Sequence, residues 1–442
     1  MPPGSRSRGV LHRVARSVRN VSAPASAHRQ ARAESATYSA IADEIEAQLR
    51  DMLAKWFPRC VDTVHGGFHQ DFGRDWAPKP ASSRILSHQA RQTWVAAQAS
   101  IHLPDLADEL TRHARHGLAY LSGPFQDEEH GGPFFFLTPG GRPETEWGGE
   151  KHTYGIVFAI FAAAATYRAT HDPRALELAL GMFRWLDERA HDESSGGYYE
   201  ALARDGTPLL TPQRGRTHDA IGTVYGYKTS NSHIHVLEAL TELYTVAPEP
   251  LVHARLAETL VLVRDRMTVP PGALGTHYTP DWRAVPMHDS FGHDVEAAYL
   301  MLETAQALGC DDGTSSVARR IIDHTLDWGW DARHGGVYFA GEAFAPAFDR
   351  AKWWWVQAEA LYAFLVMHER YRAETDRYWN AFLMQLDFIF DHVIDHRYGG
   401  WYACVSEDGR TVIADEKAMA WKAAYHDGRA LMNVTALLRR MS

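Results

Sequence analysis

Gly-Gly steps, each followed within two residues by an aromatic side chain, recur along this chain of 442 residues at nearly even intervals. Successive steps begin 60 to 79 residues apart, and three of the five intervals are 64 or 65 residues. Six copies of one unit predict a solenoid or a closed ring, because a single unit of this size cannot bury its apolar face alone. The steps begin at Gly66, Gly131, Gly196, Gly275, Gly335 and Gly399, and the fourth, Gly275-Thr276-His277-Tyr278, is degenerate.

Between the steps, apolar residues recur three and four positions apart, as at Ile41, Ile45 and Leu49, which is typical of amphipathic helices. The first helix of each pair has one apolar stripe. The second is apolar nearly all round, as over 158–165, and is therefore expected to be buried on all sides. The pattern predicts twelve helices in six pairs, at residues 37–56, 84–102, 105–122, 151–169, 173–190, 231–245, 250–267, 291–308, 315–328, 352–370, 375–394 and 417–440.

These pairs predict an all-α fold, an (α/α)6 barrel of six inner and six outer helices. An open superhelix would expose the apolar inner helices, so a closed ring is favoured. The glycines permit backbone angles that are closed to other residues. The β-prone residues after them predict short β-hairpins at the cavity rim, for example at 196–200 and 399–405.

The first 33 residues hold seven arginines and no acidic residue, although the whole chain has a net charge of −10. They lack the apolar core of a secretory signal. We expect a disordered basic arm over 1–36 or a misplaced start codon, with an organelle transit peptide as the alternative, and a single catalytic barrel domain over 37–442. The acidic balance argues against nucleic-acid binding, and no apolar run is long enough to span a membrane. Three isolated cysteines, Cys60, Cys310 and Cys404, favour a cytoplasmic location.

Unusual side chains cluster where the second helix of each pair begins, the level at which the hairpins open. Singly, each has an ordinary explanation: a histidine near a helix start is most often a cap or a surface residue, an arginine an ion-pair partner, and a tryptophan part of the core. Their coincidence at one level of all six units instead predicts a ring of side chains around one cavity. These residues are Arg91, Tyr154, Asn231, His235, His293, Glu296, Trp354, Trp355, Trp421 and His426.

Two of these segments share the pattern His-x-x-Glu, at His235/Glu238 and His293/Glu296, which places both side chains on one helix face. A carboxylate that accepts one imidazole N–H makes the other ring nitrogen a better base. The two pairs could instead bind a divalent metal, but the further carboxylates that di-iron bundles use do not accompany them. We expect no metal and no cofactor.

Aromatic side chains beside arginine and histidine favour a sugar ligand, because a sugar ring has apolar C–H faces and polar edges. The chain has no Walker A or GxGxxG motif, so a nucleotide is not expected as a reactant. The expected partner is a small-molecule sugar, with neither nucleic acid nor membrane. A homodimer is a reasonable expectation for the assembly.

Four stretches in chain order carry a family resemblance: residues 231–239, 290–297, 352–360 and 421–426, which read NSHIHVLEA, SFGHDVEA, KWWWVQAEA and WKAAYH. With them, the chain from about residue 38 to 440 resembles the N-acylglucosamine 2-epimerase superfamily. That superfamily includes cellobiose 2-epimerases and mannose isomerases, all (α/α)6 barrels. The Gly-His-Asp-Val-Glu-Ala form looks most like the cellobiose 2-epimerase branch.

The resemblance implies that His293 and His426 form an acid/base pair, with His235 as a third essential histidine near the carbonyl end of the sugar. It also implies that Arg91 binds the sugar oxygens and an enediolate. The supporting residues that it implies are Asn231 and Glu296, with Trp355 and Trp421 stacking on the sugar rings.

The chain departs from the family pattern after Trp421. Ala423 and Ala424 stand where Cys-Pro is expected, and Asp427 stands where an asparagine is expected. These changes leave His426 intact but put the identity of the sugar in doubt. A monosaccharide and a β-1,4 disaccharide both remain open.

The implied reaction is inversion of C2 of a reducing-end aldose, of the cellobiose or glucose–mannose type, by proton abstraction through an enediolate. If the proton returns to C1 instead, the product is a ketose and the enzyme is an aldose–ketose isomerase. A glycoside hydrolase or lyase on the same fold would need two acids and would leave the histidines without roles. A non-catalytic binding ring is the other alternative, since the superfamily includes a renin-binding protein.

Overall fold

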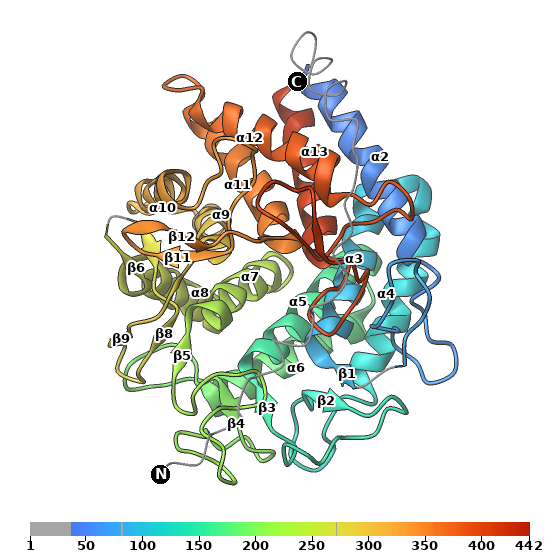
Figure 1. The fold of residues 1–442 in the computed structure, drawn as a ribbon. Helices are drawn as coiled ribbons and strands as arrows, with labels where there is room; N and C mark the ends of the chain where they lie inside the picture. The colour runs from blue at the N-terminus through green and yellow to red at the C-terminus, as the bar shows by residue number, and fades with distance from the viewer. Residues whose placement is uncertain (1–36, 81–82, 271) are drawn as a thin grey trace, which may run out of the picture.

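A computed structural model describes residues 37–80, 83–270 and 272–442, and in it the helices form a ring (Figure 1). The basic arm predicted over 1–36 lies outside the described residues. The α-helices are α2 Tyr38–Trp56, α3 Leu86–His102, α4 Ala107–Ser122, α5 Thr153–Thr170, α6 Pro173–Ala190, α7 Ser230–Val246, α8 Pro250–Val261, α9 Phe291–Leu308, α10 Thr314–Trp328, α11 Trp354–Tyr371, α12 Arg377–Phe388 and α13 Tyr425–Met441. Shorter helical turns are η2 Pro104–Leu106, η3 Leu262–Met267 and η4 Ile389–Val393.

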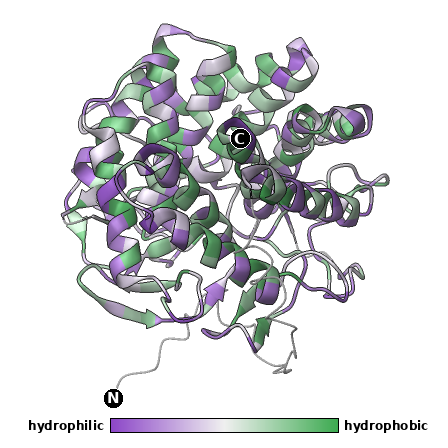
Figure 2. Cartoon of the chain, turned by 90° about the horizontal axis from the view of Figure 1, so that it is seen from above, coloured by the Kyte–Doolittle hydropathy of each residue, from purple (hydrophilic) through white to green (hydrophobic). Residues whose placement is uncertain are grey.

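Six inner helices close the ring. Helices α3, α5, α7, α9, α11 and α13 contact one another in that order, and α13 also contacts α3. The other six lie outside them, and the first, α2, packs against the last, α13, which joins the two ends of the chain. Every residue of α5 from Thr153 to Thr166 is buried. Outer helices such as α4 and α10 bury only one stripe, and both hydropathy colours therefore occur along the helices in Figure 2. The predicted closed barrel of six inner and six outer helices is confirmed.

The last predicted helix was too long. Residues 417–424 precede α13, which begins at Tyr425. Ala418 pairs with Phe72 in an isolated bridge, and the Lys422 ammonium donates to the Lys417 carbonyl, so this segment turns back on itself instead of coiling. Trp421 consequently lies on the loop that precedes α13.

Short strands join neighbouring units at one end of the ring. Each strand before an inner helix pairs with one that follows the next turn, in the antiparallel pairs β1–β2, β3–β4, β5–β8, β10–β11 and β13–β14. Local hairpins also occur, as β6–β7, β8–β9, β11–β12 and β14–β15. The strands are β1 Arg84–Ile85, β2 Phe136–Leu137, β3 Lys151–His152, β4 Ala201–Leu202, β5 Lys228–Thr229, β6 Thr268–Val269, β7 Ala273–Leu274, β8 His277–Tyr278, β9 Ala284–Val285, β10 Asp289–Ser290, β11 Ala340–Glu342, β12 Ala345–Asp349, β13 Lys352–Trp353, β14 Cys404–Val405 and β15 Val412–Ala414.

Both segments predicted as hairpin strands pair across their Gly-Gly turn, and each leads into a strand with a partner in the preceding unit. In 196–200, Tyr198 bridges His191, and the strand that begins at Ala201 pairs with β3. In 399–405, Trp401 bridges Ile394, and β14 pairs with β13 and, as a local hairpin, with β15. The short pattern of β-prone residues does not reveal that the partner strand lies about 50 residues away.

Both glycines in each of the five regular Gly-Gly steps have positive φ, between 65° and 91°, as their composition predicted. The fourth turn does not begin at Gly275. In this unit Leu274 takes the place of the residue that directly follows the glycines in the others, because Thr268 bridges Leu274 as His191 bridges Tyr198. The hydrogen bonds agree: Asp294 accepts the N–H of Leu274 as His233 accepts that of Tyr198. The aromatic Tyr278 that marked the degenerate step belongs to the next strand.

A buried ion pair closes five of the turns among the described residues. An aspartate at the start of each turn accepts backbone N–H groups of the turn through Oδ1, and its Oδ2 binds a cation near the next inner helix. The lysine distances are 2.7–3.1 Å. The pairs are Asp62–Arg84, Asp127–Lys151, Asp192–Lys228, Asp331–Lys352 and Asp395–Lys417.

Replacing a turn glycine should test this architecture. In Gly197→Ala, the new Cβ would lie 2.5 Å from Trp282 and 2.7 Å from His233 in a residue with φ of 72°. Left-handed backbone alone costs about 1–2 kcal/mol, so urea unfolding should show a free energy lowered by at least that amount. Gly181→Ala, in the middle of α6 with no atom within 4 Å of the new Cβ, should instead raise it by about 0.5–1 kcal/mol. Equal effects would contradict this account of the turns.

Candidate active site

One cavity opens where the inner helices begin, at the end of the ring that carries the strands. It encloses about 380 Å³, part of it open to solvent. All ten side chains that the sequence singled out line it, nine from inner helices and Trp421 from the loop before α13. They are Arg91, Tyr154, Asn231, His235, His293, Glu296, Trp354, Trp355, Trp421 and His426. The repeat therefore predicted correctly at which end of the inner helices these residues lie.

His426 is held from behind by a carboxylate. Its Nδ1 lies 2.5 Å from Oε1 of Glu359, an oxygen that also lies 2.8 Å from the Arg429 guanidinium. Tyr299 donates its hydroxyl to the other carboxylate oxygen. Because Glu359 acts as the acceptor for these donors, His426 carries its proton on Nδ1. This tautomer leaves the lone pair of Nε2 free to act as a base.

The predicted His-x-x-Glu pairing is right for one pair and wrong for the other. His235 Nδ1 lies 2.9 Å from Glu238 Oε2, as expected. In contrast, His293 Nδ1 contacts the Ser290 hydroxyl at 2.8 Å, and Glu296 accepts from Arg429 instead. A shared helix face brings the two side chains near each other, but a guanidinium is the stronger partner for the carboxylate.

The Ser290 contact makes the His293 imidazole chemically different from that of His426. A serine hydroxyl can donate or accept, so His293 can carry its proton on Nε2 while Nδ1 accepts from Ser290. His426 does not have this freedom, since Glu359 only accepts. His426 is therefore held as a base at Nε2, whereas His293 can carry a proton on either nitrogen, and Ser290 can accept from Nδ1–H when the ring is protonated.

Arg429, which binds carboxylates behind the cavity wall, is a residue that the sequence analysis missed. Its guanidinium binds Glu238, Glu296 and Glu359, three carboxylates from three inner helices, and it is 3% exposed. A second cavity, deeper in the ring, is lined in part by Arg429 and Glu238. The available signal was position, because Arg429 follows His426 by three residues and shares its helix face.

Burial and charge set the ionisation of these groups. Burial, only partly offset by Glu296, lowers the pKa of His293 to about 4. Burial and the nearby Arg91 lower the pKa of His426 well below its ordinary value. Although burial disfavours a charged Glu238, Arg429 and His235 hold its pKa at about 2. The His293 and His426 imidazoles are therefore neutral at pH 7, in the form that can accept a proton.

Arg91 and the aromatic rings form the rest of the wall. The Arg91 guanidinium lies 4.2 Å from the ring centre of Phe158 and donates to the Tyr154 hydroxyl at 2.6 Å. The Trp355 ring contacts two of the imidazoles, with its centre 4.9 Å from that of His293 and 5.8 Å from that of His426. A flat apolar face with a cation opposite suits a sugar ring with an oxyanion.

The metal alternative can be tested against this geometry. Glu296, Glu359 and His426 bring three potential ligand atoms within 4.8 Å of one another. The Arg429 guanidinium binds both carboxylates, so the cation of this cluster is already part of the chain. The residues present thus fit an arginine-centred network and not a metal site.

Comparisons with known proteins agree with this site. Residues 66–430 match the family N-acylglucosamine 2-epimerase (GlcNAc 2-epimerase). The cellobiose 2-epimerase of Ruminococcus albus is 30% identical over 88% of this chain and 97% of its own, and the D-mannose isomerase of Marinomonas mediterranea is 25% identical over 89% and 97%. The solved cellobiose 2-epimerase of Spirochaeta thermophila superimposes with a TM-score of 0.81 at 31% identity, covering 91% of this chain and 98% of that one. The chain therefore belongs to the N-acylglucosamine 2-epimerase family, a family of epimerases and isomerases.

Proposed function

We propose that the protein inverts C2 of a reducing-end aldose of the cellobiose or glucose–mannose type, with His293 and His426 as its acid and base. The observation that carries this proposal is the pair of neutral imidazoles that line one cavity, both in contact with Trp355 and in different hydrogen-bonded states. Two titratable groups in unlike environments are the usual sign of an acid and a base.

The reaction begins with the open-chain aldehyde. His426 Nε2 removes the proton from C2, and the electron pair moves into the C1–C2 bond while the carbonyl oxygen becomes negative. Arg91 stabilises this enediolate, and Glu359 stabilises the imidazolium that forms at His426. His293, protonated from solvent to the imidazolium beside the negative enediolate, then donates its Nε2 proton to C2 from the opposite face, so the configuration inverts and His293 returns to its neutral form. Solvent takes the proton from His426 before the next turnover. The reverse reaction exchanges the two roles, which rotation of the Ser290 hydroxyl permits.

His235 and Asn231 supply polar groups near the carbonyl end of the sugar. Trp354, Trp355, Trp421 and Tyr154 supply ring faces, and Glu296 positions Arg429 beside the acid/base pair. The step needs no reactant besides the sugar and solvent protons: the proton removed from C2 leaves on His426, and the proton returned there comes from His293, which solvent reprotonates.

The second candidate is aldose–ketose isomerisation at the same site. The D-mannose isomerase among the relatives supports it, and it differs only in whether the enediolate is protonated at C1 or C2. The three free cysteines fit the proposed cytoplasmic location. Among the described residues, no helix is long and apolar enough to cross a bilayer.

Incubation in heavy water tests the function directly. Proton NMR of glucose, mannose and cellobiose should show deuterium entering C2 of the substrate together with appearance of the C2 epimer. Accumulation of the ketose as the main product would assign the isomerase instead. If none of these sugars, nor N-acetylglucosamine or N-acetylmannosamine, gains deuterium at C2, the proposed function is wrong.

A further inference from the structure

The fourth unit breaks the ion-pair rule that its neighbours follow, and the break lies directly behind the catalytic wall. In units one, two, three and five, the residue two positions before the inner helix is a cation: Arg84, Lys151, Lys228 and Lys352. In unit four this position is Asp289. The acid that should oppose it, at the start of the turn, is replaced by Val269.

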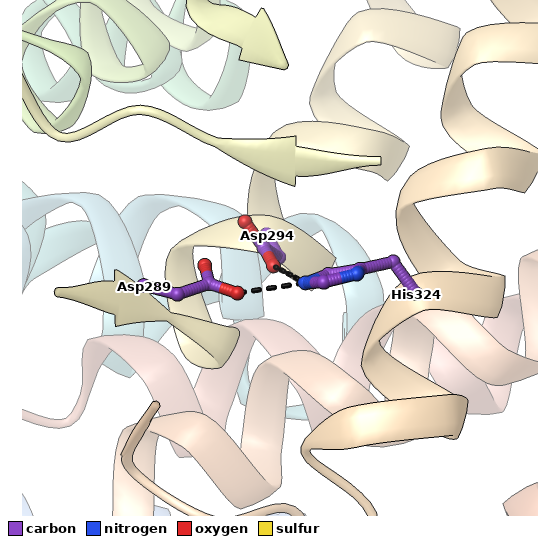
Figure 3. Close-up of side chains that lie close together, drawn as sticks. All are labelled: Asp289, Asp294 and His324. Atoms are coloured by element: carbon purple, nitrogen blue, oxygen red, sulfur yellow. Dashed lines mark hydrogen bonds and ion pairs between the residues drawn. The ribbon is translucent and has the colours of Figure 1, made fainter. Parts of the chain in front are cut away.

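Asp289 has a different set of neighbours from the cations that it replaces. His324 of outer helix α10 places its Nε2 2.7 Å from Asp289 Oδ2 and 3.9 Å from Asp294 Oδ2 of inner helix α9 (Figure 3). All three residues are at most 4% exposed. Three potential ligand atoms, one from each residue, lie within 4.8 Å of one another.

No lysine or arginine among the described residues pairs with this cluster. Among the described residues, His324 is the one basic side chain within ion-pair distance of either aspartate. Oδ1 of Asp289 and Oδ2 of Asp294 have no hydrogen-bond donor, although both are buried. Figure 3 shows this Asp294 oxygen directed toward the imidazole, with which it makes the 3.9 Å ion pair. Each carboxylate thus has one buried oxygen without a donor, which is unfavourable for the charged group unless a cation or a proton neutralises it.

We propose that Asp289, Asp294 and His324 bind one divalent first-row transition-metal ion, such as zinc. Two carboxylates and a neutral imidazole balance a charge of +2, and carboxylate oxygens and imidazole nitrogens ligate zinc at about 2.0–2.2 Å. The histidine disfavours calcium and magnesium, which take oxygen ligands. A water or a second carboxylate oxygen completes the coordination.

The ion has a structural role that is separate from the sugar chemistry. Its ligands come from β10, α9 and α10, so it fastens the start of an inner helix to an outer helix and to the strand before it. Asp294 directly follows His293, which lines the sugar cavity. The unit that carries His293 thus replaces the usual ion pair with a metal clamp.

Zinc binding by the full-length protein tests the proposal without any measurement on sugars. After removal of metals with a chelator, the protein is incubated with zinc chloride, desalted and analysed by mass spectrometry for metal content. We expect about one zinc per chain and a higher thermal unfolding midpoint. Cobalt(II) should give visible d–d bands without the thiolate charge-transfer bands of a cysteine site.

Asp294→Gln is the decisive variant because units one and five already have glutamine in this register. Gln89 and Gln357 accept the backbone N–H of their turns as Asp294 accepts that of Leu274, so the substitution keeps the fold. It should lose the bound zinc and the zinc-dependent rise in unfolding midpoint. His253→Gln, at an exposed position on α8, should keep both.

The competing explanation is that protons alone neutralise the cluster. Under it, wild-type protein would retain no more zinc than Asp294→Gln, and its unfolding midpoint would not respond to zinc. Either result overturns the metal site. Because these measurements involve no substrate, they succeed or fail independently of the epimerase assignment.

Discussion

Removing either His293 or His426 should nearly abolish epimerisation but leave proton exchange at one face of C2 intact. His426→Ala and His293→Ala should each lower the turnover number by about 10²–10⁴-fold, the usual contribution of one acid or base. The reason is that the C2 proton leaves from one face of the enediolate and returns to the other. Initial rates with mannose and cellobiose, in both directions of the reaction, measure the effect.

Exchange with heavy water then distinguishes the two bases. In the His426→Ala protein, the epimer whose C2 proton faces His293 should still exchange that proton with solvent, whereas the other epimer should not. The His293→Ala protein should show the opposite preference. Exchange of both epimers at equal rates in either variant would indicate a single base and contradict the two-base arrangement. His253→Ala, on the exposed face of α8, is the matched control.

The ability of His426 to act as a base depends on its carboxylate partner, Glu359. Glu359 fixes the Nδ1–H tautomer, so the histidine alone is not the complete base. This dependence could not be found by counting histidines in the sequence, because Glu359 lies 67 residues away on another inner helix. Only the closed ring brings the two together.

Much of the architecture follows from short-range patterns. The interval between glycine steps predicted six units, and the unbroken apolar run over 158–165 predicted that α5 is buried on all sides. Equivalent positions of repeated units lie at the same height along the axis of the ring. Polar residues at the starts of the six inner helices were therefore expected to surround one cavity. The ten residues of the cavity wall were therefore accessible from the sequence.

The errors arose where partners are distant in sequence or where a unit departs from the repeat. Tyr278 lies three residues after Gly275 and so resembles the aromatic residue of a glycine step, whereas backbone pairing assigns that place to Leu274. Glu296 had two candidate partners, and its spacing from His293 could not reveal the guanidinium of Arg429 from another helix. Asp289 was unremarkable until the other units supplied a register in which a cation was expected.

Loss of Arg429 should have the largest effect on stability. Arg429→Met removes the cation shared by Glu238, Glu296 and Glu359 and leaves these buried carboxylates with no guanidinium. Breaking a buried ion pair by removing one partner typically costs about 3–5 kcal/mol. Urea unfolding at pH 7 should show a loss of that size. Arg440→Met, on the exposed face of the same helix, should change the free energy by no more than about 0.5 kcal/mol.

The pH dependence of this loss identifies its cause. In the wild type, the pKa of Glu238 is held at about 2, so its ionisation adds stability above the unfolded value of about 4.3, and this stability is lost as the pH falls toward 2. Without Arg429, burial raises the pKa of the same carboxyl above its unfolded value, and ionisation then opposes folding at neutral pH. The difference in unfolding free energy between wild type and Arg429→Met should therefore narrow as the pH falls from about 7 to 4. Arg429→Lys, which keeps one positive charge but cannot reach three carboxylates at once, should lie between them. A difference that stays constant over this pH range would mean that Arg429 acts through packing and not through its charge.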